Sequence, residues 1–278
     1  EACPPTGWPA PKLQALKEKG YEIEAAPARQ RLALQLLGCL SSPAPALRDG
    51  IAFEAWSRWL RADALDLQTR QAGLATLQPR IAPGTVDAAG FGQPFAALVR
   101  SELARSDRKQ PWLEPAQRAA LLESAARYLE SVHDYRGFIG GEGWRHGVAH
   151  GADLLMQLAL NPALDKAQLD RILAAVASQL APPGQSYVFG EPGRLARPVL
   201  FAAARGLHSQ AEWQDWFSKI AAPPTGGWQG AFGSTAGLAR RHDVHAFLLE
   251  IYLQARDSEE AGIKAMLPAL RTQLEAVP

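Results

Sequence analysis

The sequence is poor in the features that mark specialised classes of protein: it has two cysteines, two methionines and no surplus of either charge. Lys and Arg number 29 against 28 Asp and Glu, and no block of like charges stands out. The basic footprint of a nucleic-acid-binding protein is therefore missing. Apolar runs such as 246–253 stop well short of the roughly 20 residues that a membrane span needs. We expect no nucleic-acid partner and no membrane span.

Short motifs of common enzyme classes are also missing. The sequence has no G-x-S-x-G elbow, no phosphate-binding P-loop and no dinucleotide fingerprint. Nucleophilic catalysis is therefore unsupported. Eight tryptophans suggest a carbohydrate-binding surface, but Trp56 and Trp59, like Trp213 and Trp216, are spaced three apart. That spacing is typical of the core-facing side of a helix.

The two-residue alternation of a β-strand is almost absent, whereas apolar residues recur at spacings of three and four. Proline and glycine supply the stops between these segments. Only 186–189 has the composition of a short strand, and an extended loop is favoured there. The predicted class is all-α. Helices are expected at 11–19, 27–40, 50–61, 64–81, 91–106, 115–132, 143–160, 166–180, 192–207, 210–221, 235–256 and 260–275.

A faint repeat suggests how these helices are arranged. Glu114, Asp165 and Ser209 each stand three residues before Gln or Glu, the spacing of a capping box, at intervals of 51 and 44 residues. Such intervals suit a unit of two helices. We predict one domain over 1–278, a curved stack of antiparallel helical hairpins of the HEAT or armadillo kind. A closed α/α toroid is the alternative.

The stretch from Asp134 to Gln157 concentrates residue types that chemistry uses. In the helix predicted over 143–160, His146, His150 and Asp153 fall on one polar stripe. Glycines on another line of the same helix, at spacing four, indicate that a second backbone approaches closely there: Gly143, Gly147 and Gly151.

The polar stripe has three interpretations. Two histidines at i, i+4 suit a divalent metal such as zinc, with Asp153 as a third ligand and His245 as a fourth from a later helix. The Glu that follows the first His in zincin helices is replaced here by Gly147. A metal-free polar pocket and a structural hydrogen-bonded cluster are the other two interpretations, and the residues do not decide among the three.

The glycine-rich loop before that helix is a second candidate for a binding site. Asp134 and Arg136 lie in DYRGFIGGEG, where free backbone N–H groups and a guanidinium suit the capture of an anionic substrate. The plainer interpretation is that Asp134 and Arg136 pair with each other.

The run DYRGFIGGEGWRHGVAHGADLLMQLALNP resembles the signature of a bacterial family known as domain of unknown function 2785. GEPGRLARPVLFAAARGL and HAFLLEIYL resemble later helices of that family, so the similarity covers about residues 50–255 and leaves 1–49 outside. The resemblance implies an all-helical fold and no established activity. The residues that match the motif are Asp134, Arg136, Gly137, Trp144, His146, His150 and Asp153.

Cys3 and Cys39 bear on the compartment of the protein. The proline-rich start EACPPTGWP is expected to follow a removed secretory signal, which predicts a periplasmic or secreted protein, with a cytoplasmic one as the alternative. An even cysteine count fits one disulfide, and we predict that Cys3 and Cys39 are joined, because the proline-rich leader has few other means of being held in place. The alternative is that Cys39, in an apolar run, is a buried free thiol.

Two functions remain open from the sequence. The first is metal-assisted hydrolysis of a small or extracytoplasmic substrate, with Asp134, Arg136, His146, His150 and Asp153 as the catalytic set. The alternative is a non-enzymatic, HEAT-like binding or scaffold module in which the His/Asp cluster is structural. The ligand, either a small molecule or a protein, is not specified.

Overall fold

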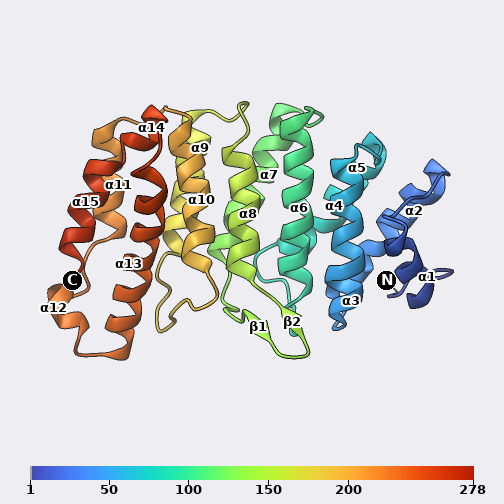
Figure 1. The fold of residues 1–278 in the computed structure, drawn as a ribbon, viewed down its shortest axis with the longest axis horizontal. Coiled ribbons are helices and arrows are strands. Elements are labelled where there is room, and N and C mark those ends of the chain that lie inside the picture. The colour runs from blue at the N-terminus through green and yellow to red at the C-terminus, as the bar shows by residue number, and fades with distance from the viewer. Residues whose placement is uncertain (1) are drawn as a thin grey trace. The chain divides into compact units, whose positions relative to one another are not determined.

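A computed structural model describes residues 2–278 and is mostly helical, which confirms the all-α prediction (Figure 1). The chain divides into two compact units, one ending at Gln157 and the other beginning at Leu158. The prediction of a single domain stays a prediction.

The first unit is built from successive helices, with the β-hairpin in the connection between α7 and α8. In it, α6 packs against α4 and α5. The elements are α1 (Ala10–Glu18), α2 (Ala26–Leu36), the 3-10 turn η1 (Leu37–Ser41), α3 (Pro45–Leu47), the π-helical turn η2 (Arg48–Phe53), α4 (Glu54–Arg61), α5 (Leu67–Leu77), η3 (Pro79–Ile81), α6 (Gly92–Lys109), α7 (Pro115–Glu130) and the start of α8 (Gly147–Ala159).

The second unit contains the remaining helices. Its α10 packs against α9 and α13, and α15 packs against α11 and α13. The elements are α9 (Lys166–Ser178), α10 (Glu191–Ala204), α11 (Gln210–Ile220), α12 (Gly227–Ala231), α13 (Thr235–Ala255), α14 (Ala261–Lys264) and α15 (Leu267–Ala276).

A short antiparallel hairpin is the only β-sheet among the described residues. Strand β1 (Phe138–Ile139) pairs with β2 (Gly143–Trp144) and sets Phe138 opposite Trp144. The hairpin lies just before α8, at the lower end of that helix in Figure 1. Residues 186–189, the stretch considered for a strand, form none.

Capping residues fix several helix starts as the sequence predicts. Asp165 and Ser209 cap α9 and α11, and Gln168 and Glu212 accept hydrogen bonds from the cap residues' backbone N–H groups. At α7, the Gln117 side chain accepts from the N–H of Glu114 at 2.9 Å. The spacing of these residues therefore predicts the hydrogen bonds that cap the three helices.

Tryptophan spacing also gives the expected burial. Trp56 and Trp59 on α4 are 0% and 3% exposed and Trp213 on α11 is 1% exposed, whereas Trp216 is half-buried. The indole N–H groups of the first two donate to backbone carbonyls, of Ala33 at 2.7 Å and of Tyr21 at 2.9 Å. These bonds satisfy the polar atom of each buried indole.

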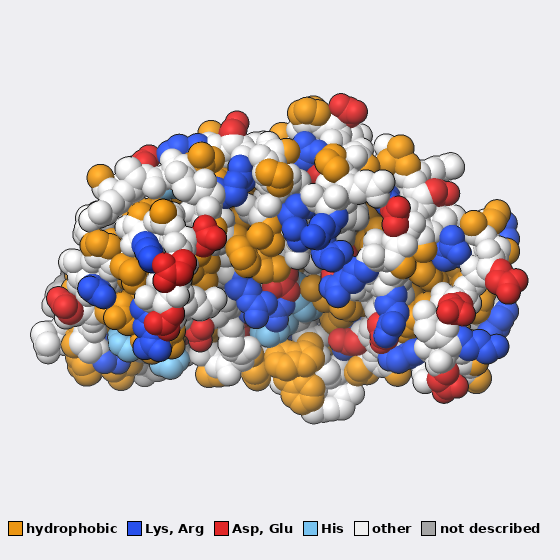
Figure 2. All heavy atoms as spheres, turned by 45° about the horizontal axis from the view of Figure 1, so that its top comes forward, with side chains coloured by type: hydrophobic (Ala, Val, Ile, Leu, Met, Phe, Trp, Pro, Cys, Tyr) orange, Lys and Arg blue, Asp and Glu red, His pale blue; other side chains and the backbone are white. Residues whose placement is uncertain are grey.

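Cys3 and Cys39 are joined by a disulfide, so the bridge prediction agrees with the structure. The bridge ties the segment before α1 to η1. Among the described residues, no helix is long and apolar enough to cross a membrane. On the face drawn in Figure 2, acidic and basic side chains are interspersed, apart from a short run of basic ones near its middle.

Candidate functional site

The helix predicted over 143–160 begins later, at Gly147, so its predicted start is wrong. Gly141 and Gly143 take positive φ angles, of 80° each, and turn the chain into the β-hairpin instead. His146 follows with φ 60°, in the left-handed region, and its carbonyl accepts from the N–H of His150 at 3.0 Å. His146 therefore lies just before α8, and only His150 and Asp153 are on the helix.

The two imidazoles are buried between aromatic rings. The His146 ring stacks on Trp144 with centroids 4.6 Å apart, and the His150 ring meets the Phe95 ring edge-on at 5.2 Å. His150 Nδ1 lies 3.1 Å from the carbonyl oxygen of Pro94. His146 and His150 are only 8% and 6% exposed, so both side chains are packed against their neighbours.

The donor groups proposed for a metal are distributed as follows. The His146 and His150 rings are 6.0 Å apart between centroids, and Asp153 is buried one turn further along α8. His245 lies half-buried on α13 of the second unit. Within residues 2–278, no three His, Cys, Asp or Glu side chains are grouped so that they could hold a metal ion. The metal site stays a prediction without geometric support.

Asp134 and Arg136 pair with each other. Arg136 Nε and Nη2 lie 2.8 and 2.5 Å from the two carboxylate oxygens of Asp134. Burial alone would raise the pKa of Asp134, but these hydrogen bonds hold it below its ordinary value. A Cβ at Gly90 would meet both side chains, at 2.4 and 2.6 Å, so this glycine leaves room for the pair. The guanidinium proposed as an anion clamp is thus already engaged.

The prediction that another backbone approaches the glycine line closely is wrong, because the nearest atoms are side-chain atoms and the one backbone atom near Gly147, the Asp134 carbonyl oxygen, would lie 3.7 Å from an added Cβ. Gly143 lies in the hairpin, and a Cβ at Gly151 would meet side-chain atoms of Leu129 and Tyr128 at 3.1 and 3.2 Å. The Tyr128 hydroxyl donates to the carbonyl of Gly147 at 3.3 Å. The glycines make room for an aromatic side chain of α7.

The second His/Asp cluster lies on α13. His242 is exposed and Asp243 is fully buried. Asp243 Oδ1 accepts from the N–H of Tyr187 at 2.9 Å and so holds the loop before α10. Burial raises the pKa of Asp243 to about 6, and the nearby Glu191 carboxylate adds to the rise, against the lowering by Tyr187 and His242.

We expect Asp243→Asn to stabilise the protein at pH 7.5 and not at pH 4. The native pKa of Asp243 lies above that of an unfolded aspartate, so the cost of ionising it is absent below about pH 4 and complete above about pH 6. Asparagine keeps the acceptor for Tyr187 without the charge. Urea unfolding should give a gain of up to about 3 kcal/mol at pH 7.5. An equal change at both pH values would contradict the assignment.

The sequence did not predict a groove of about 1010 Å³ in the first unit. Its walls come from the segment after α1 and from α4 with the turn that follows it. The volume is at the upper end of the roughly 300–1,000 Å³ typical of ligand sites. Its charged and aromatic lining residues are Tyr21, Glu22, Glu24, Arg29, Glu54, Arg58, Trp59 and Arg61.

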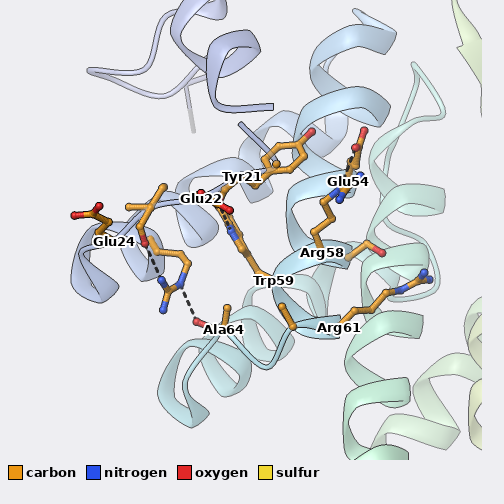
Figure 3. A pocket seen from close by; sticks show the side chains of 13 residues that line it. Tyr21, Glu22, Glu24, Glu54, Arg58, Trp59, Arg61 and Ala64 are labelled. Atoms are coloured by element: carbon orange, nitrogen blue, oxygen red, sulfur yellow. Dashed lines mark hydrogen bonds and ion pairs between the residues drawn. The ribbon is translucent and has the colours of Figure 1, made fainter. Parts of the chain in front are cut away.

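Charged side chains line both walls of this groove, and the α4 wall carries Glu54 beside Arg58. Figure 3 shows Glu22 and Glu24 on one side, Arg58 and Arg61 on the other, and Trp59 between them. Both glutamates are exposed, and no hydrogen bond or ion pair within residues 2–278 holds either carboxylate. The arginine side chains are 59% and 56% exposed, and each is paired, Arg58 with Glu54 at 3.3 Å and Arg61 with Glu102 at 2.5 Å.

Backbone-directed hydrogen bonds hold the acidic wall in place. Trp59 Nε1 donates to the carbonyl of Tyr21, whose own hydroxyl donates to the carbonyl of Gly50 at 2.6 Å. Arg29 spans the end of the groove, donating to the carbonyls of Ile23 at 2.8 Å and Ala64 at 2.9 Å. The groove is therefore a preformed feature rather than a gap between loose segments.

A comparison with family models matches residues 84–253 to the family described as Protein of unknown function (DUF2785). The chain belongs to this family. The match confirms the resemblance that the sequence suggested, although it begins at residue 84 rather than near residue 50. Comparison with curated proteins and with solved structures finds no match.

The matched range divides the candidate sites. The hairpin, His146, His150, Asp153 and the Asp243 cluster lie within it, whereas the groove lies between residues 20 and 64, before it begins. The groove is therefore a property of the part of this chain outside the family match.

Proposed function

We propose that this chain is a non-enzymatic binding module, a stack of helical hairpins of the HEAT or armadillo kind, whose groove binds short peptides that carry one basic and one acidic side chain. The single observation that carries the proposal is that the unpaired, exposed carboxylates of Glu22 and Glu24 face the exposed guanidinium groups of Arg58 and Arg61 over the floor at Trp59. An extended peptide can place unlike side chains on the two walls.

The buried His/Asp cluster supports the non-enzymatic part of the proposal. His146 and His150 pack against Trp144, Phe95 and the carbonyl of Pro94. In this account, the cluster fixes the hairpin to the start of α8 and has no chemical role. The Asp134–Arg136 pair supports the base of the hairpin in the same way.

We also propose that the module works outside the cytoplasm, in the periplasm or as a secreted protein. The Cys3–Cys39 disulfide supports this location, because such bridges persist in oxidising compartments.

Calorimetric titration with capped tetrapeptides tests the proposed function. The panel contains Lys-Ala-Ala-Glu, Glu-Ala-Ala-Lys and tetra-alanine, acetylated and amidated so that only side chains carry charge. We expect saturable binding of at least one charged peptide and none of tetra-alanine. Arg58→Glu and Glu22→Lys should each weaken that binding about 10-fold, roughly 1.4 kcal/mol.

Arg127→Glu is the matched control, because Arg127 on α7 pairs with the glutamate four residues before it, as Arg58 does on α4. This variant should bind as the wild type does. If no charged peptide binds, or if the two groove variants bind as tightly as the control, the groove is not the binding site.

A further inference from the structure

Two arginines of α6, Arg105 and Arg108, have no acidic partner. Both are half-buried, and neither forms an ion pair within residues 2–278. Residues three apart on a helix are neighbours on its surface, so the two positive charges lie beside each other. Burial lowers the pKa of Arg108, and the Arg105 charge lowers it further. Like charges at this spacing repel each other, and an anion bound against them would relieve the repulsion.

The carboxylates nearest in the sequence do not neutralise this pair. Glu102, one turn before Arg105, is 6% exposed and accepts from Arg61 of α4 through both oxygens, at 3.0 and 2.5 Å. On α8, Asp153 is 8% exposed and forms no ion pair with either arginine. Within residues 2–278, the protein therefore supplies no carboxylate to pair with Arg105 or Arg108.

A glutamine of α8 completes the cluster. Arg108 Nη2 donates to Gln157 Oε1 at 3.1 Å, and since that oxygen accepts, the amide N–H groups of Gln157 remain free to donate. Free donors also remain on Arg105 and at Arg108 Nη1. None of these nitrogens has a partner within residues 2–278 and all of them reach solvent, whereas Arg108 Nε alone is closed to it.

Every free polar group that this cluster presents to solvent is thus an N–H donor, which suits an oxyanion. A guanidinium is a planar fork of donors that matches the oxygens of a carboxylate or a phosphate. The two unpaired arginines together carry two positive charges. A phosphate monoester carries about −1.5 to −2 at pH 7 and so matches them better than a singly charged carboxylate does.

We propose that Arg105, Arg108 and Gln157 bind the phosphate monoester group of a small soluble compound. Figure 2 shows basic side chains gathered over the part of the molecule where α6 lies. The cluster lies within the range matched to the family and shares no residue with the lining of the groove. The proposal is therefore independent of peptide binding.

Two-dimensional ¹H–¹⁵N NMR tests the site during titration with inorganic phosphate, glycerol 2-phosphate, dimethyl phosphate and acetate at pH 7.5 and constant ionic strength. We expect the first two to bind saturably and to move the side-chain amide resonance of Gln157, which Gln157→Ala assigns. Dimethyl phosphate, a singly charged diester like the phosphate of many lipids, and acetate should bind about 10-fold more weakly or less, because each lacks the second charge.

Arg105→Gln should weaken phosphate binding by about 10-fold or more. Arg105 forms no hydrogen bond within residues 2–278, so the substitution should leave the backbone amide spectrum of the folded protein in place. Arg31→Gln is the matched control, because Arg31 is exposed on α2, likewise has no partner in the described part of the chain, and carries the same charge. It should bind phosphate as the wild type does.

Three results would overturn the proposal. The first is that neither inorganic phosphate nor glycerol 2-phosphate moves the Gln157 resonance saturably. The second is that acetate or dimethyl phosphate binds as tightly as inorganic phosphate. The third is that Arg105→Gln binds phosphate as tightly as Arg31→Gln.

Discussion

Opening the Cys3–Cys39 disulfide is expected to lower the free energy of unfolding by about 3–4 kcal/mol. The bridge closes a sequence separation of 36 residues, and closing a loop of that size restricts the unfolded chain. Urea unfolding with and without a reducing agent measures the effect. The Cys3→Ala/Cys39→Ala variant should resemble the reduced protein and should not respond to the reducing agent.

The same change should weaken peptide binding, because the bridged loop includes the segment that forms the acidic wall of the groove. Tyr21 and Glu22 lie between the two cysteines in the sequence and are held to α4 by the Trp59 hydrogen bond. Titration of thiols in the denatured, unreduced protein first establishes that the disulfide is present. Two reactive thiols per chain, or an unchanged unfolding midpoint after reduction, would contradict the account.

Replacing Asp107 with alanine should destabilise the first unit by about 3–5 kcal/mol, because it leaves a buried guanidinium without its partner. Asp107 is 1% exposed and accepts from Arg118 Nε at 2.7 Å and from the N–H groups of Trp112 and Leu113 at 3.0 and 2.8 Å. These bonds join the end of α6 to the start of α7.

The pH dependence of this site has a definite sign. Burial alone would raise the pKa of Asp107, but the hydrogen bonds from Arg118, Leu113 and Trp112 hold it below its ordinary value. The stabilisation is therefore present at neutral pH and is lost as the pH falls through the native pKa. Glu123→Ala removes an exposed ion pair with Arg127 and should stay within about 1 kcal/mol of the wild type. Equal effects of the two substitutions on urea unfolding would contradict the assignment.

Helix positions could be predicted from the sequence because local chemistry sets them. Proline and glycine end each apolar segment, and the capping boxes at Asp165 and Ser209 mark helix starts directly. The predicted start of α8, at residue 143, was wrong. Phe138 pairs with Trp144 across the hairpin and His146 has a left-handed φ, so the chain is not helical before Gly147 although its residue pattern is.

The candidate groove could not be predicted, for a physical reason. Glu22 and Arg58 are far apart in the sequence, and at each position the sequence predicts an ordinary solvent-exposed side chain. They face each other only because Trp59 donates to the carbonyl of Tyr21 and brings the two segments together. The predicted role of the histidines stays a prediction. Their spacing indicated a shared polar face, but His146 and His150 are each buried against aromatic rings.

The indole N–H resonance of Trp59 gives the most direct test of the groove as a binding site, because this group lies on the groove floor and is bonded to the acidic wall. The chemical shift of this N–H is measured while ¹⁵N-labelled protein is titrated with the charged tetrapeptides. The Trp59→Phe variant assigns the signal. The account predicts saturable shifts of Trp59 and of backbone amides in 21–24 and 61–64. Shifts confined to other parts of the chain, or no saturable shift at all, would contradict it.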